Sequence, residues 1–184
     1  MLRSVALLVL SALLTILPAA GQDEDKDKNL DVRSPIGDLH VGKDADAQAA
    51  GLPLYPGARP KHDPNQEALN LGLLTENFGL KLVVAKYETD DPPAKVLAYY
   101  RNKMKKYGKV LECRGTDDNT GSHAENDDDP SKPVTCEGNN TGPVRELKVG
   151  TEGNAHIVAI ENPEGAKETT FAIVYLRRHQ KGDI

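Results

Sequence analysis

The apolar positions at the start of the chain form one uninterrupted run at residues 5–17, which follows Arg3. Small residues at 18–21 separate this run from an acidic segment that begins at Gln22. An early positive charge, a short apolar core and small residues at the exit predict a secretory signal peptide at residues 1–21. Because the run is too short to cross the roughly 30 Å hydrocarbon layer comfortably, we expect no membrane span after cleavage. The alternative is an N-terminal anchor that is not cleaved.

After the leader, the pattern changes from charged to alternating. Residues 22–29 hold no apolar side chain that could be buried, which is typical of a disordered spacer. Apolar and polar residues then alternate at 30–32 and 39–41, on either side of a turn sequence at 34–37. This arrangement predicts a strand, a turn and a strand, added as a hairpin at the edge of the domain. The segment 22–50 is therefore expected to be an acidic spacer with an edge hairpin.

The main domain is predicted to span residues 51–178. Its strongest strand candidate is 78–88, which is apolar on both faces at its centre and therefore suits a central position in a sheet. A helix is predicted from about 92 to 107, and the carboxylates of Asp90 and Asp91 are expected to bind the free amides of its first turn. The apolar residues of this helix form one stripe that should be buried against the sheet: Val96, Leu97, Tyr100, Met104 and Tyr107.

The remainder of the domain is predicted to consist of strands, at 110–114, 134–137, 144–149, 155–161 and 170–177. One clear helix and five or more strands joined by short turns predict an α+β fold. In this fold a mainly antiparallel sheet carries the amphipathic helix on one face. The last residues, 179–184, are predicted to be a tail.

Charge and composition narrow the classes of partner. The chain has a formal net charge of −5, and loss of Arg3 with the leader makes the mature chain −6. An acidic protein is poorly suited to nucleic acid, because neutralising phosphates requires a basic surface. With no Trp and only two Phe, the chain offers few aromatic platforms on which bases or sugars could stack. We therefore expect no nucleic-acid partner, and the composition indicates no cofactor.

The two cysteines, Cys113 and Cys136, are predicted to form a disulfide, because an even number of cysteines in an exported protein favours a covalent bridge. They enclose 22 residues, and closing a loop of that length stabilises a fold by about 3 kcal/mol. Acidic residues dominate the loop, so self-repulsion would spread it apart without a tie at its base. The alternative is a pair of free buried thiols.

The predicted helix carries basic residues opposite its apolar stripe, and it has no acidic residue between positions 94 and 107. One interpretation is a patch that binds an anionic partner, such as a lipid headgroup or an acidic cell-wall polymer. The other is a solvated face whose cations favour the negative C-terminal end of the helix. The residues of this basic patch are Lys95, Arg101, Lys103, Lys105 and Lys106.

The loop between the cysteines contains oxygen-bearing side chains at spacings that match part of a calcium-binding loop. A complete loop of that kind also needs a bidentate Glu at a fixed position and flanking helices. Position 128, where that Glu would fall, is Asp, and Pro130 follows closely. Weak divalent-metal binding and a solvated loop without metal are the two interpretations. The candidate ligands are Asp117, Asn119, Asp127, Asp128 and Asp129.

Common catalytic motifs are missing from the sequence. The five histidines are scattered, with no pair at the spacing of a metal site, and His156 is predicted to be a buried core histidine. No serine lies in a Gly-x-Ser-x-Gly motif, and no glycine-rich phosphate loop is followed by Lys and Ser or Thr. These observations remove the common routes to an enzyme without excluding one.

Three features of the main domain resemble a group of uncharacterised exported bacterial proteins. They are a Pro-x-Tyr-Pro-Gly-Ala segment at 53–58, a strand that ends at 87–89, and an Asp- and Pro-capped helix with a Val-x-x-Tyr-Tyr-Arg core at 96–101. The resemblance covers residues 51–178. It implies a bacterial envelope setting and a sheet domain with one helix, and it implies no activity, ligand or catalytic residue.

Taken together, these features predict an exported envelope protein in the periplasm or outside the cell. The expected function is a non-enzymatic binding or accessory domain, with an anionic envelope component as its partner. The alternative is a hydrolase or another enzyme with a non-standard site, in which the acidic loop would hold a divalent metal.

Overall fold

The computed structural model describes residues 29–42, 45–61, 68–115, 129–136, 140–160 and 167–180. The predicted signal peptide and the first residues of the spacer lie outside this part of the chain. Among the described residues, no helix is both long and apolar enough to span a membrane.

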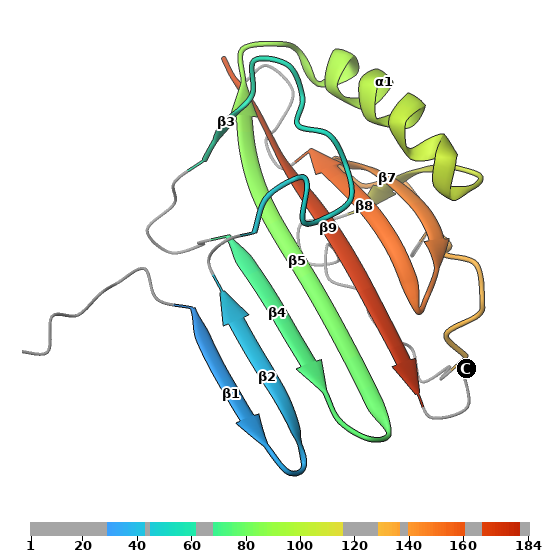
Figure 1. Cartoon of the computed structure of the whole chain (residues 1–184). Coiled ribbons are helices and arrows are strands. Elements are labelled where there is room, and N and C mark those ends of the chain that lie inside the picture. The colour runs from blue at the N-terminus through green and yellow to red at the C-terminus, as the bar shows by residue number, and fades with distance from the viewer. Residues whose placement is uncertain are drawn as a thin grey trace, which may run out of the picture.

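A single antiparallel sheet organises the described residues (Figure 1). Its order is β1-β2-β4-β5-β9-β8-β7-β6, and the short β3 pairs with the end of β5 that β4 leaves free. This architecture confirms the predicted α+β fold. The strands are β1 (Leu30–Ser34), β2 (Gly37–Gly42), β3 (Arg59–Pro60), β4 (Leu69–Leu74), β5 (Phe78–Thr89), β6 (Leu111–Gly115), β7 (Val144–Thr151), β8 (Asn154–Ile160) and β9 (Thr169–Gln180).

The two long central strands, β5 and β9, hold the sheet together. They pair in one unbroken antiparallel register, from Phe78 opposite Gln180 to Thr89 opposite Thr169. The sequence of β5 is apolar on both faces at its centre, and its central position in the sheet confirms that interpretation. Figure 1 shows that these strands run the full length of the sheet, so that α1 lies near one end of them and β1, β2 and β4 lie along the other.

The helix α1 (Pro93–Met104) lies over β7 and β8 on one face of the sheet. It continues as a 3₁₀ turn, η1 (Lys105–Tyr107), and the chain then turns at Gly108, whose φ of 136° is a conformation that favours glycine. Four residues of the predicted stripe are fully buried: Val96, Leu97, Tyr100 and Met104. They pack over a core that the sheet supplies with Val83, Leu147, Val149, Val158, Phe171 and Ile173.

Tyr107, the fifth residue of the predicted stripe, is 36 % exposed, and its placement in the core was wrong. The backbone tightens from an α-helix to a 3₁₀ turn before this residue, which takes its side chain out of the helical period. The Tyr107 hydroxyl instead donates a hydrogen bond to the Gly51 carbonyl at 2.6 Å. Its ring stacks on His156, with 3.8 Å between the ring centroids.

The start of α1 also differs from the prediction, because neither acidic residue before it caps the helix. Pro92 occupies the N-cap position, and no side chain binds the first amides. The prolines at 92 and 93 lack N–H groups, which reduces the number of donors that need a cap. Asp91 instead accepts hydrogen bonds from Lys95 Nζ at 2.7 Å and from the Tyr55 hydroxyl at 2.8 Å, and these donors lower the pKa of Asp91.

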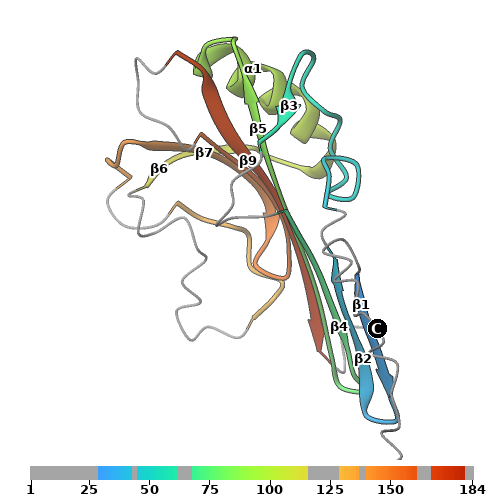
Figure 2. The same ribbon diagram turned by 90° about the vertical axis from the view of Figure 1, so that its left-hand side faces the viewer.

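The predicted edge hairpin is present as β1 and β2, and it is joined to the rest of the sheet. Residues 38–42 of β2 pair with 70–74 of β4. The segment that follows, 45–58, runs beside α1 on the same face of the sheet (Figure 2). Its residues Ala47 and Ala50 are buried in the main core. The core therefore includes residues that precede position 51.

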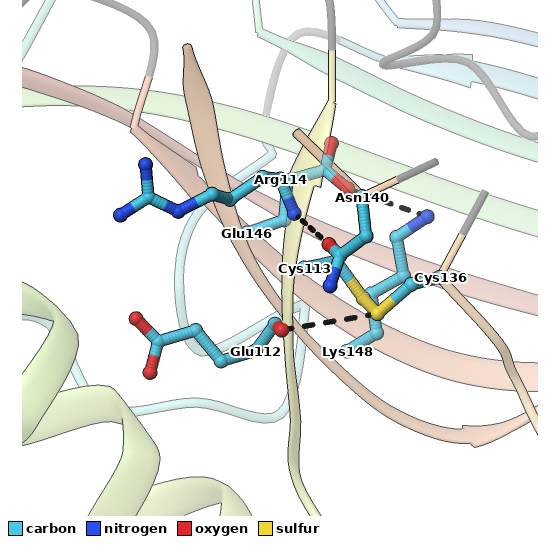
Figure 3. Close-up of a disulfide and its surroundings, with 7 residues drawn as sticks. All are labelled: Glu112, Cys113, Arg114, Cys136, Asn140, Glu146 and Lys148. Atoms are coloured by element: carbon cyan, nitrogen blue, oxygen red, sulfur yellow. Dashed lines mark hydrogen bonds and ion pairs between the residues drawn. A yellow bond between two sulfur atoms is a disulfide. The ribbon is translucent and has the colours of Figure 1, made fainter. Parts of the chain in front are cut away.

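The disulfide between Cys113 and Cys136 is present, as predicted, with 5.3 Å between the Cα atoms (Figure 3). It ties β6 to the segment 132–136, which runs along the edge of β7 beyond the end of β6. A strand at 134–137 was the wrong prediction for this segment. Pro133 makes one isolated bridge to Thr151, and because proline lacks a donor the ladder does not extend.

Candidate functional site

The outer part of the sheet forms the candidate site. We use the term outer sheet for β1, β2, β4 and the parts of β5 and β9 that lie beside them, residues 78–84 and 174–180. Figure 2 shows this part extending away from α1 and from the segment 45–58. Because successive side chains in a strand point to opposite faces, the pairing register determines which residues share the helix side.

A cavity of about 560 Å³ lies on the helix side of the outer sheet, and we call it the trough. Each strand of the outer sheet contributes to its lining. The side chains and glycines that line it on this face are Asp31, Arg33, Asp38, His40, Asn70, Gly72, Leu74, Gly79, Lys81 and Arg177.

Two glycines make the hollow. Gly72 lies between His40 on β2 and Lys81 on β5 in the same row across the strands. Gly79 lies directly opposite Leu74 in the next row. Since glycine weakens a strand, its presence inside one often marks a place where another molecule approaches the backbone. A Cβ atom at position 72 would meet only the His40 Cβ, at 3.5 Å, so the space above this glycine is open.

Charged side chains lie on both sides of this floor. On one side, His40 Nδ1 is 2.7 Å from Asp31 Oδ1. On the other side, Lys81 and Arg177 are directly opposite each other on β5 and β9, and both are exposed. Like charges in directly opposite positions destabilise a sheet. Arg177 forms no hydrogen bond or ion pair with another described residue, so the repulsion in this pair is not relieved by a neighbouring acid.

The trough can therefore bind an anion. Its lining has three permanent cations, Arg33, Lys81 and Arg177, against the two carboxylates Asp31 and Asp38. The opposite face of the outer sheet is mainly aliphatic, and Arg178 is a cation on it, directly opposite Leu80. Half-buried aliphatic residues on this face include Leu39, Val41, Leu69, Leu71, Leu73, Leu80 and Leu82. Among the described residues, no group of three or more His, Cys, Asp or Glu side chains is placed to hold a metal ion.

The basic patch predicted on the helix is largely engaged in contacts within the protein. Lys95 pairs with Asp91 at 2.7 Å, and Arg101 pairs with Glu112. Glu112 also binds Arg145 at 2.7 Å, and these two guanidinium groups lower the pKa of Glu112. Ion pairs of this kind neutralise part of the field that an anionic partner would meet.

The rest of the patch lies beside a second hollow, of about 800 Å³, between α1 and the segment 46–54. Lys103 and Lys106 line it, together with Asp46. The Lys103 ammonium lies 5.3 Å from the centre of the Tyr99 ring, and Lys106 Nζ donates a hydrogen bond to the Gly51 carbonyl at 3.3 Å. Lys105 is exposed. An anionic partner at this face of the helix stays a prediction.

The candidate metal ligands of the acidic loop lie outside the described residues, with one exception. The Asp129 carboxylate accepts hydrogen bonds from the Ser131 hydroxyl at 2.6 Å and from the Ser131 backbone N–H at 2.9 Å. These bonds lower the pKa of Asp129. This local turn accounts for the orientation of the carboxylate. Metal binding by Asp117, Asn119, Asp127 and Asp128 stays a prediction.

His156 is buried, as predicted, between the rings of Tyr107 and Tyr175. Burial, reinforced by the charge of Lys106, lowers the pKa of His156 to about 4. The unfolded chain takes up the proton near pH 6.5, whereas the folded protein resists it down to about pH 4. Stability is therefore fully present above pH 6.5 and is lost as the pH falls toward 4.

We expect the free energy of unfolding to fall by about 2 kcal/mol between pH 6.5 and pH 5 because of this histidine. Urea unfolding at the two pH values measures the change. His156→Phe keeps an aromatic ring in the stack but cannot bind a proton, so its free energy of unfolding should change little between these two pH values. The carboxylates with lowered pKa values, Asp91 and Glu112, act in a lower pH range. An equal slope in the variant would contradict the assignment to His156.

No family model, curated protein or solved structure matches this chain. The site is therefore defined by its own residues. The residues of the trough were not predicted as a site from the sequence. Two features of the sequence point toward this site. One is the polar side of the predicted hairpin, which carries Asp31 and His40, and the other is Gly72, which interrupts a segment rich in leucine.

Proposed function

We propose that the protein is an exported, non-enzymatic binding domain of the cell envelope, periplasmic or extracellular, that holds an anionic envelope component in the trough. The observation that carries this proposal is the opposed pair Lys81 and Arg177 beside the open floor at Gly72. Two cations in directly opposite positions reduce the stability of the free protein, and a bound anion would relieve that cost. The disulfide is consistent with an oxidising, exported location.

Direct titration with small anions tests the proposal. Inorganic phosphate, glycerol 3-phosphate and N-acetylmuramic acid represent free phosphate, a phosphate headgroup and a cell-wall carboxylate. We expect saturable binding at low salt. Calorimetry measures the affinity, and amide chemical-shift changes on titration should be concentrated at the residues of the trough. Lys81→Glu and Arg177→Glu should each weaken binding about tenfold or more, because hydrogen bonds to charged groups contribute roughly 1.5–3 kcal/mol.

Lys105→Glu is the matched control, because Lys105 is an exposed lysine on η1, away from the trough. It makes the same charge change and should leave binding unchanged. Equal affinity for Lys81→Glu, Arg177→Glu and the parent protein would contradict the proposal. Loss of binding only in the double variant Lys103→Glu/Lys106→Glu would instead place the anion in the second hollow.

One observation favours the alternative, a hydrolase or another enzyme with a non-standard site. The Asp31 carboxylate contacts Nδ1 of His40 at 2.7 Å on the edge of the trough, and a carboxylate in this position can orient an imidazole for general acid–base catalysis. Hydrolysis of p-nitrophenyl acetate and p-nitrophenyl phosphate, with and without calcium, magnesium or zinc, tests this candidate. Activity that His40→Gln abolishes would support an enzyme, whereas activity that this variant retains would count against this site.

A further inference from the structure

The strand β1 forms one edge of the sheet in the described part of the chain, where it pairs with β2 only. All five of its residues are exposed. Leu30 is 55 % exposed and Val32 is 45 % exposed, which is unusual for two aliphatic side chains on one face of one strand. An edge of this kind is a template for pairing with another strand.

The hairpin determines which backbone groups of β1 are free to pair. Its turn has two residues, so Ser34 and Gly37, on either side of the turn, exchange backbone hydrogen bonds. Alternation along the ladder then directs the backbone groups of Val32 toward Leu39 of β2. The N–H and C=O groups of Asp31 and Arg33 point away from β2, to the open edge.

The sequence of β1 is complementary to itself in only one register. Two copies related by a two-fold axis can pair antiparallel about Asp31, Val32 or Arg33. An axis through Asp31 or through Arg33 places two like charges directly opposite each other, which is destabilising. An axis through Val32 places Asp31 of each copy opposite Arg33 of the other. The same register makes Asp31 and Arg33 the hydrogen-bonded pairs, in agreement with the free backbone groups.

We propose that a second copy of this chain pairs with β1 in the register centred on Val32, so that two sheets become one continuous antiparallel sheet. Val32 then packs against Val32 of the second copy, and Leu30 lies opposite Ser34. On the helix side, Arg33 of the second copy lies beside the Asp31–His40 pair and adds a cation to the end of the trough. The interface is one short strand, so the dimer is weak and reversible.

Sedimentation equilibrium tests this pairing without any ligand, so its outcome is independent of the proposed function. We expect the purified protein to shift from monomer to dimer as its concentration rises to about 500 µM, as befits a small interface. Asp31→Arg and Arg33→Asp should each remain monomeric, because each places like charges opposite each other twice. The double variant Asp31→Arg/Arg33→Asp restores opposite charges and should restore the dimer.

The double variant also separates pairing from other effects of these substitutions. It lacks the Asp31–His40 contact just as Asp31→Arg does, so recovery of the dimer excludes that contact as the cause. Glu76→Arg is the matched control, since Glu76 is an exposed acid in the turn between β4 and β5, and it should dimerise like the parent. A parent protein that stays monomeric, a dimeric Asp31→Arg variant, or a monomeric double variant would each overturn the proposal.

Discussion

Replacing Phe171 with alanine should lower the free energy of unfolding by about 3–5 kcal/mol, since truncating a buried aromatic ring removes its contacts and leaves a cavity. Phe171 is fully buried at the centre of an aromatic cluster. Its ring stacks on Tyr87 with 5.6 Å between centroids and lies 5.7 Å from Tyr100 and 6.3 Å from Tyr55. These rings come from a strand, the helix and the 45–58 segment, so one truncation loosens all three. Urea unfolding measures the loss.

A loss of that size is a large part of the roughly 5–15 kcal/mol by which a domain is stable. Phe78→Ala is the matched control, because Phe78 is the same residue type on β5 and is only half-buried. It should cost clearly less. If the two variants lost equal stability, the aromatic cluster would not be the main core of the fold.

The elements predicted best from the sequence were those whose apolar pattern agrees with the surfaces that bury them. The stripe Val96, Leu97, Tyr100 and Met104 is helical in period and lies on the sheet. The strand at 78–88 is apolar on both faces and is central. In these elements, local propensity and tertiary burial favour the same structure, so periodicity was sufficient.

The predictions that were wrong concern side chains that had more than one possible hydrogen-bonding or packing partner. Asp91 could cap α1 or bind Lys95 and Tyr55, and the choice depends on Tyr55, which is 36 residues away in the chain. Tyr107 left the helical period because the chain tightens into a 3₁₀ turn just before Gly108. Neither outcome follows from spacing within a single segment.

The trough was not predictable for a related reason. Its central row joins His40, Gly72, Lys81 and Arg177 across four strands. A shift of one residue in any of the pairings would move a member of this row to the other face of the sheet. The sequence indicates that these strands exist, but the site depends on their registers. In contrast, the disulfide was predictable, since the chain contains only two cysteines.

That disulfide supports the last prediction: reduction should lower the free energy of unfolding by about 3 kcal/mol, the contribution expected from the 22-residue loop it closes. For a domain of this size, the melting temperature should fall by about 6–12 °C. Cys113 is 1 % exposed whereas Cys136 is half-buried, so a reductant should reach the bridge from the Cys136 side. Thermal unfolding with and without dithiothreitol measures the shift.

The variant Cys113→Ala/Cys136→Ala supplies the control, because it should melt at the temperature of the reduced protein and be insensitive to dithiothreitol. A disulfide of this kind forms and persists in an oxidising compartment, which is the setting of the proposed function. Protein isolated from its host under alkylating conditions should therefore carry no labelled cysteine and should lack the residues before position 22. An intact Met1 together with two alkylated thiols would mean that the chain stays in a reducing compartment, and that this part of its stability is absent there.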